Sequence, residues 1–159
     1  MKLLLPLIFI AQVFAIHCAI IPDGVYIIKA KNTGMVLDIY GALTTNFIDL
    51  IIYPVHYGTN QQFRITSVGN GLYTIHPVHC YKALSVPNFS EQDVDIVQLD
   101  VTGDLNQQWE FVEKKDGFYM IRSKSSGKVL EAPLVSAEAV PQKRKACTDN
   151  QLFSLQKYY

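Results

Sequence analysis

A threefold internal repeat is the feature that most limits how this chain can fold. Each copy opens on a Gly-x-Tyr step, at Gly24-Val25-Tyr26, Gly71-Leu72-Tyr73 and Gly117-Phe118-Tyr119. The opening glycines are 47 and 46 residues apart. Each copy closes on a second shared signature, at Asn60-Gln61-Gln62-Phe63, Asn106-Gln107-Gln108-Trp109 and Asn150-Gln151-Leu152-Phe153. Two features that recur in one order at a near-constant period indicate a repeat architecture.

The apolar segments within each copy are short and are separated by turn residues. In the first copy they cover about residues 25–29, 36–39, 49–53 and 62–65. Segments of this length rich in Val, Ile, Tyr and Phe predict strands, four in each copy and twelve in all. A propeller blade also has four strands, but a propeller typically needs at least four blades. Three copies therefore predict an all-β chain, a β-trefoil with twelve short strands in three pseudo-equivalent repeats, about 24–70, 71–116 and 117–158, which form a single domain over residues 24–158.

The first fifteen residues have the pattern of a signal peptide. Lys2 precedes an apolar run over residues 3–14, which is too short to span a bilayer, and Ala15 is a small residue at the cleavage position. Cleavage after Ala19 is the alternative, and a buried first strand is the other interpretation of the run. No second long apolar run follows. We therefore expect a secreted, extracellular and soluble protein with no membrane span.

Charge and cysteine content narrow the class of protein further. Fourteen basic residues balance fourteen acidic ones, whereas a nucleic-acid-binding protein needs a basic surface. We therefore expect no nucleic-acid partner. Cys18, Cys80 and Cys147 suit an oxidising compartment, but their spacing leaves the pairing open. Cleavage after residue 19 would also remove the first of them.

The repeated Gln-x-aromatic step resembles the QxW signature of ricin-B-type lectins, and the resemblance extends over about residues 24–158. Residues i and i+2 of a strand face the same way, so the glutamine and the ring both point toward the core. A buried amide needs hydrogen-bond partners, which we expect in the backbone of a neighbouring turn. We therefore assign a scaffold role to Gln61, Phe63, Gln107, Trp109, Gln151 and Phe153.

The resemblance implies a shallow sugar pocket in each lobe, made by an acidic residue, an aromatic platform and the Asn before the QxW glutamine. The first lobe matches this pattern through Asp38 as hydroxyl acceptor, Tyr53 as platform and Asn60 as second contact. Strand alternation places Asp38 and Tyr40 on one outward face if their apolar neighbours face inward. His56 and Tyr57 are further rim candidates. The alternative is that Asp38 is a solvated strand residue and the tyrosines cap the core.

The other two lobes match the sugar-site pattern less well. In the second, Ser85 stands at the acidic position and Leu99 at the aromatic one. In the third, Glu131 keeps the charge, but the platform region is the basic stretch of residues 143–145, which we interpret as a solvated loop. The residues expected in these weaker pockets are Asn106, Glu131 and Asn150.

Two further motifs bear on modification and metal binding. Asn88-Phe89-Ser90 is an acceptor sequence for N-glycosylation in a predicted loop. His76 and His79 lie three residues apart, so on a strand they point to opposite faces, and we expect no metal site. The sequence shows no nucleophile elbow, phosphate loop or zinc-hydrolase motif, which predicts neither an enzyme nor a cofactor.

The function expected from these features is that of a secreted carbohydrate-binding, lectin-like module with one sugar pocket in the first repeat. Its partners would be glycans or glycoproteins. The alternatives are a secreted trefoil that binds a protein partner, as an effector or protease inhibitor, and a structural coat protein. The weak pattern in two lobes favours the alternatives, and retention of Asp38, Tyr53 and Asn60 favours the lectin.

Overall fold

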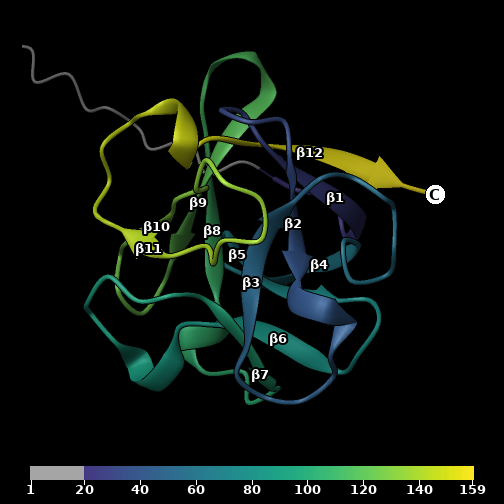
Figure 1. Ribbon diagram of the computed structural model, residues 1–159. Helices are drawn as coiled ribbons and strands as arrows, with labels where there is room; N and C mark the ends of the chain where they lie inside the picture. Colours follow the sequence, from purple (N-terminus) through teal and green to yellow (C-terminus); the bar gives the residue numbers. More distant parts are fainter. Residues whose placement is uncertain (1–19) are drawn as a thin grey trace, which may run out of the picture.

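A computed structural model describes residues 20–159, so the predicted signal peptide and Cys18 lie outside the described residues. Within that range the chain forms twelve strands and five short 3-10 helices, arranged as a β-trefoil (Figure 1). The predicted fold class is confirmed. The helices are η1 (Tyr40–Ala42), η2 (Pro87–Phe89), η3 (Leu105–Gln107), η4 (Lys115–Gly117) and η5 (Asp149–Gln151).

The strands follow the expected apolar segments closely, with shifts of a few residues at their ends. They are β1 (Gly24–Ala30), β2 (Val36–Ile39), β3 (Ile48–Tyr53), β4 (Phe63–Gly69), β5 (Leu72–Pro77), β6 (Lys82–Ser85), β7 (Val97–Asp100), β8 (Trp109–Glu113), β9 (Phe118–Ser123), β10 (Val129–Leu130), β11 (Gln142–Lys143) and β12 (Phe153–Tyr158). The third-lobe hairpin, β10–β11, has the shortest strands. Pro133 lies soon after the end of β10 and Pro141 directly before β11, and a proline cannot donate a ladder hydrogen bond that would extend the pairing.

Six of the strands close into a barrel. β1 pairs with β4, β4 with β5, β5 with β8, β8 with β9, β9 with β12 and β12 with β1, and every pairing is antiparallel. The β12–β1 pairing covers the register from Val25↔Tyr158 to Ala30↔Phe153. Closure of the ring leaves none of these six strands as a free edge.

The other six strands form three hairpins, β2–β3, β6–β7 and β10–β11. These hairpins contact one another through the β3–β7 pairing and the isolated bridges Ile51↔Ala139 and Asp95↔Pro141. Backbone segments from all three repeats therefore meet at one end of the barrel (Figure 1). The loops that leave this hairpin layer position the site described below.

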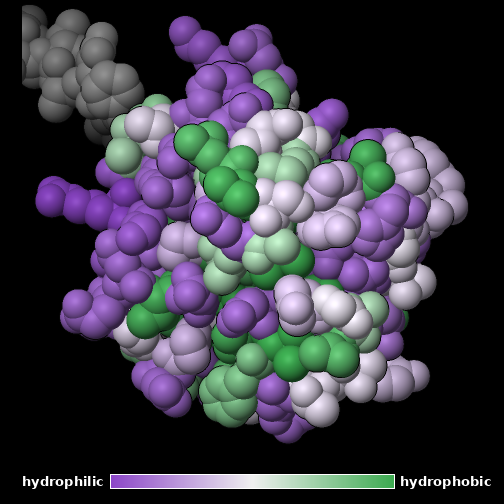
Figure 2. Space-filling model, in the orientation of Figure 1, coloured by the Kyte–Doolittle hydropathy of each residue, from purple (hydrophilic) through white to green (hydrophobic). Residues whose placement is uncertain are grey.

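The core is built from equivalent residues of the three repeats. Phe63, Trp109 and Phe153 are completely buried, and the Trp109 indole donates a hydrogen bond to the Leu84 carbonyl at 3.1 Å. The surface is mixed, and Figure 2 shows apolar side chains scattered between polar ones on the face seen there. No helix among residues 20–159 is long and apolar enough to cross a membrane.

Candidate functional site

A pocket of about 330 Å³ lies between the end of β2, the end of β3 and the turn before β4. The four residues predicted for the first-lobe site all line it: Asp38, Tyr40, Tyr53 and Asn60. His56, Gly41, Ile51 and Ala137 complete the wall. The structure thus brings together the four predicted residues, of which Asp38 and Asn60 are 22 positions apart in the sequence.

The β2–β3 register places the platform tyrosine beside the carboxylate. Asp38 lies opposite Ile51 and Val36 opposite Tyr53, so Tyr53 is the diagonal neighbour of Asp38. Tyr53 is 41% exposed and Tyr40 54% exposed. The Tyr53 and His56 rings meet edge to face, with centroids 6.0 Å apart and planes at 73°. An exposed ring held in this way can receive the apolar face of a sugar.

Asp38 and Tyr40 line the same pocket, but the alternative that Asp38 is a solvated strand residue is wrong. Asp38 is only 2% exposed, because all four residues of β2 are buried, on both faces of the strand. The turn of residues 54–61 covers the outer face through two side chains. Asn60 donates from Nδ2 to Asp38 Oδ1 at 2.8 Å, and Gln61 donates from Nε2 to Asp38 Oδ2 at 2.8 Å.

The ring of His56 supplies a third contact to the buried carboxylate. The Gly58 backbone N–H donates to Nδ1 of His56 at 3.1 Å, so the neutral ring carries its proton on Nε2. Nε2 lies 3.2 Å from Asp38 Oδ2 and donates to it. Burial raises the pKa of Asp38 above its ordinary value, although the hydrogen bonds from Gln61, His56 and Asn60 act in the opposite direction.

Asn60 and Gly58 fix the polar wall of the pocket. Asn60 Nδ2 also donates to the Ile39 carbonyl at 3.2 Å, which commits both of its N–H groups. A Cβ on Gly58 would lie 2.7 Å from Asn60 Oδ1 and 2.7 Å from His56 Cε1. Only glycine permits this close approach. The Asn60 side chain is thus oriented with its donors toward the protein.

The three signature glutamines make equivalent hydrogen bonds. Each is buried, and each donates from Nε2 to a backbone carbonyl seven residues earlier: Gln61 to Pro54 at 3.0 Å, Gln107 to Asp100 at 2.8 Å and Gln151 to Arg144 at 3.0 Å. Each also accepts a backbone N–H of the same turn, from His56 at 2.8 Å, Thr102 at 2.9 Å and Ala146 at 2.8 Å. All three glutamines therefore bond the turns of the scaffold, and Gln61 alone also contacts the candidate site, through its hydrogen bond to Asp38.

The second-lobe pocket holds aromatic rings that sequence reasoning missed. Its volume is about 370 Å³, and Asn106 lines it together with Phe47 and Phe89. These rings are 62% and 53% exposed. Phe47 comes from the loop before β3 and Phe89 from η2, outside the strand position at which a platform was sought, and the repeat pattern contains no signal for them. Asn88, the predicted glycosylation site, is exposed at the same pocket.

The third-lobe residues are occupied with structural contacts. Glu131 Oε2 accepts the Gln151 amide at 2.9 Å, and Asn150 Oδ1 accepts the Thr148 hydroxyl at 2.6 Å. Lys143 takes the register position that Tyr53 has in the first lobe and pairs with Asp93 at 3.4 Å. The third lobe therefore has the Lys143–Asp93 salt bridge at the position where the first lobe has the Tyr53 ring.

The histidines considered for metal binding bond separate carbonyl oxygens. His76 Nδ1 lies 2.9 Å from the Lys82 oxygen and His79 Nε2 lies 3.0 Å from the Leu43 oxygen. Among residues 20–159 no group of three or more His, Cys, Asp or Glu side chains gathers as a metal would require. Cys80 and Cys147 do not form a disulfide with each other.

The fold and the first-lobe pocket together define the lectin-like class of β-trefoil. The fold is a closed barrel with three hairpins, and the pocket holds a hydrogen-bonded carboxylate beside an exposed aromatic ring. Residues 11–99 and 105–159 match the sequence profile of the family described as ricin-type beta-trefoil lectin domain-like. The chain belongs to this family, which confirms the resemblance drawn from the QxW signature. No curated protein is significantly similar to the sequence.

Several solved structures share the fold. ThreeFoil, a designed threefold-symmetric protein, is 34% identical, with a TM-score of 0.83 over 86% of this chain and 100% of its own. An exo-beta-1,3-galactanase from Clostridium thermocellum is 28% identical, with a TM-score of 0.82, and the match covers 87% of this chain but 31% of the galactanase. A Macrolepiota procera ricin B-like lectin in complex with lactose is 16% identical, with a TM-score of 0.75 over 88% of this chain and 100% of that one. At that identity the likeness shows the fold alone.

Proposed function

We propose that the chain is a secreted carbohydrate-binding protein whose first-lobe pocket binds one pyranose unit of a glycan. The observation that carries the proposal is the exposed Tyr53 ring next to a carboxylate that three side chains hold in place. The sugar would lay its C–H face on Tyr53 and donate a hydroxyl to Asp38. Because the acceptor is already fixed, binding orders few side chains and loses little conformational entropy.

The same pocket supports binding without catalysis. Asp38 is the one acidic residue among those that line it, whereas glycoside hydrolysis generally uses a pair of carboxyl groups flanking the scissile bond. A single pocket of this size also binds weakly on its own, so useful affinity would come from clustered glycans or from several copies of the protein.

β-Galactosides are the ligands to test first. The Macrolepiota procera lectin is described in complex with lactose, and the Polyporus squamosus lectin is described bound to an epitope that contains β-linked galactose. The 28% identical galactanase acts on a galactan. These relatives motivate lactose as the soluble probe and a glycan array as the broad screen.

The test compares Tyr53→Ala with Tyr57→Ala on the array and by calorimetry with lactose. Tyr57 is also exposed, but its ring stacks on Tyr158 at 6.5 Å and does not line the pocket. We expect Tyr53→Ala to weaken binding about tenfold through loss of the stacking face and Tyr57→Ala to leave it unchanged. A blank array from folded wild-type protein would contradict the proposal.

A protein partner is the second candidate, and the exposed Phe47 and Phe89 rings favour it. Aromatic side chains that remain exposed around a concavity are typical of protein-binding surfaces. Exchange of both rings for serine, followed by cross-linking in the secreting cells, would test this. Loss of a specific cross-linked partner supports the second candidate, and an unchanged cross-linking pattern contradicts it.

Secretion and glycosylation are proposals that one expression experiment tests. The full chain expressed in eukaryotic cells should appear in the medium with a new N-terminus after Ala15 or Ala19. Treatment with an N-glycosidase should lower its mass, and the Asn88→Gln variant should lack that change. An intracellular product that retains Met1 would contradict the signal-peptide interpretation.

A further inference from the structure

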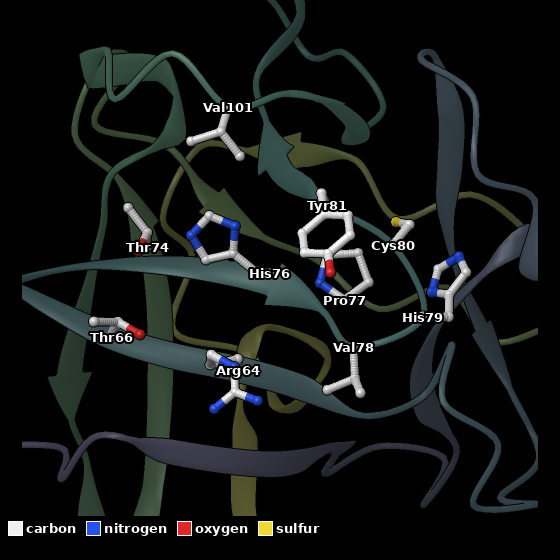
Figure 3. A pocket seen from close by; sticks show the side chains of 10 residues that line it. All are labelled: Arg64, Thr66, Thr74, His76, Pro77, Val78, His79, Cys80, Tyr81 and Val101. Atoms are coloured by element: carbon white, nitrogen blue, oxygen red, sulfur yellow. The ribbon is translucent and has the colours of Figure 1, made fainter.

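A larger pocket, of about 630 Å³, lies away from the three lobe positions on the outer wall of the barrel. Its floor is the β4–β5 hairpin, and its rim is the loop that follows β5 together with Val101 (Figure 3). Arg64, Thr66, Thr74, His76 and Tyr81 are the polar and aromatic residues on which the following argument rests.

Strand alternation brings four of these side chains onto one face. Phe63 and Ile65 of β4 are buried in the core, so Arg64 and Thr66 point outward. The antiparallel register pairs Arg64 with His76 and Thr66 with Thr74. Directly opposed side chains have Cβ atoms about 5 Å apart, so a basic pair and a hydroxyl pair lie next to each other on the pocket floor.

The charge at this position differs from that of its pseudo-equivalents around the barrel. In the β8–β9 pair the corresponding residues are Glu110 and Arg122, which form an ion pair. In the β12–β1 pair they are Ser154 and the single cation Lys29. At Arg64 two basic side chains face each other, and none of the ion pairs formed within residues 20–159 includes Arg64.

An arginine opposite a neutral histidine, with no carboxylate in an ion pair with it, is an arrangement that leaves the guanidinium to solvent in the protein alone. It becomes favourable when an anion occupies the pocket, because a guanidinium can form two parallel hydrogen bonds with a carboxylate or with a tetrahedral oxyanion. The unneutralised Arg64 therefore indicates a ligand that carries negative charge.

The remaining groups suit a sugar ring attached to that charge. His76 directs Nδ1 at the Lys82 carbonyl at 2.9 Å. A carbonyl oxygen only accepts, so Nδ1 carries the proton and Nε2 is the acceptor of the neutral ring. Tyr81 is 98% exposed and lines the same pocket. Figure 3 shows the Tyr81 ring on one side of His76 and Thr74 on the other.

We propose that this barrel-wall pocket binds an acidic pyranose, a sugar that bears a carboxylate or a sulfate. The oxyanion pairs with Arg64, sugar hydroxyls bond His76 Nε2 and the two threonine hydroxyls, and the apolar face of the ring lies against Tyr81. The site is separate from the first-lobe pocket, since the two share no lining residue.

Nuclear magnetic resonance titration of the purified protein tests the proposal. The probes are methyl glucuronide, a sulfated methyl glucoside and the neutral methyl glucoside. We expect the amide signals of Thr66, Thr74, His76 and Tyr81 to shift with an acidic probe, and those of residues 38 and 60 to stay unchanged. A response to glucuronide alone identifies carboxylate as the recognised group, and a response to the sulfated sugar alone identifies sulfate. Equal shifts with the neutral glucoside, or no shifts with either acid, overturn the proposal.

Arg64→Gln supplies the decisive variant and Lys29→Gln its matched control. Both remove one exposed positive charge from the outer wall of the barrel, but Lys29 takes the register position of His76 in another strand pair and does not line this pocket. We expect Arg64→Gln to raise the Kd for the acidic probe about tenfold, Arg64→Lys to have an intermediate effect, and lactose binding to be unaffected. An equal loss in Lys29→Gln would show a general charge effect and overturn the site.

Discussion

Asp38→Asn changes the central acceptor of the first-lobe pocket without changing its shape. The carboxylate receives Asn60 Nδ2 on Oδ1 at 2.8 Å, and on Oδ2 it receives Gln61 Nε2 at 2.8 Å and His56 Nε2 at 3.2 Å. An amide has one acceptor oxygen. If that oxygen faces Gln61 and His56, the new NH₂ group faces the NH₂ group of Asn60, donor against donor.

The cost follows from that mismatch. Loss of one hydrogen bond with a buried donor left unpaired costs about 1–3 kcal/mol. The neutral amide recovers part of this, because burial raises the pKa of Asp38 and so disfavours its charged form. We expect the free energy of unfolding to fall by about 1–2 kcal/mol, or about 3–6 °C in Tm for a domain of this size. Lactose affinity should fall about tenfold, since a donor replaces the charged acceptor.

Urea denaturation and lactose calorimetry measure the two effects, and Ser85→Ala is the matched control. Ser85 is the pseudo-equivalent partner of Gln107, whose amide keeps its bond to the Asp100 carbonyl at 2.8 Å when the serine hydroxyl is removed. That variant should lose about 1 kcal/mol or less and bind lactose normally. If Asp38→Asn is as stable as the wild type and binds lactose equally well, the reasoning is refuted.

Three further perturbations have defined outcomes. Lactose affinity should decline in calorimetry as pH falls through the raised pKa of Asp38, and Asp38→Asn should lack this decline. A raised carboxyl pKa means that the folded state binds the proton better than the unfolded state, so the contribution of this group to the free energy of unfolding grows as pH falls and is lost as pH rises. Unfolding caused by protonation of Asp38 therefore cannot explain a loss of lactose affinity at low pH. Gly58→Ala should weaken lactose binding, because its Cβ would displace Asn60 and His56; normal affinity would show that the turn relaxes freely. Trp109→Ala should reduce the free energy of unfolding by about 3–5 kcal/mol in urea titrations, and Trp109→Phe by much less, because phenylalanine serves at the two equivalent positions.

The architecture could be predicted because its determinants are local and occur three times. A Gly-x-Tyr step begins each repeat and a buried Gln with an aromatic ring ends it, and both have the same structural role in every lobe. The glutamine bonds backbone groups of its own turn. Its pattern therefore persists whether the neighbouring side chain is Asp38, Ser85 or Glu131.

For the first-lobe site, the sequence predicted which residues line the pocket but not how they are packed and hydrogen-bonded. Strand alternation placed Asp38 and Tyr40 on one face, and they line one pocket, but alternation could not reveal that a turn that is distant in sequence covers Asp38. The Phe47 and Phe89 rings were missed because they lie outside the strands, on residues with positive φ of 61° and 52°. Such backbone conformations are rare for these residues, and a repeat pattern does not reveal them. The barrel-wall pocket depends on the opposition of Arg64 and His76, which only the strand register establishes.

The pairing of β12 with β1 has a consequence for biogenesis. β1 is made early during synthesis, but one of its two barrel partners is the segment of residues 153–158. Until that segment emerges, the hydrogen-bonding edge of β1 that it covers stays open to other chains. Among the strand pairings of the described residues, this one joins residues that are furthest apart in the sequence, so closure is entropically slow and comes last. The nascent protein thus depends on its surroundings to shield that edge until synthesis reaches the final strand.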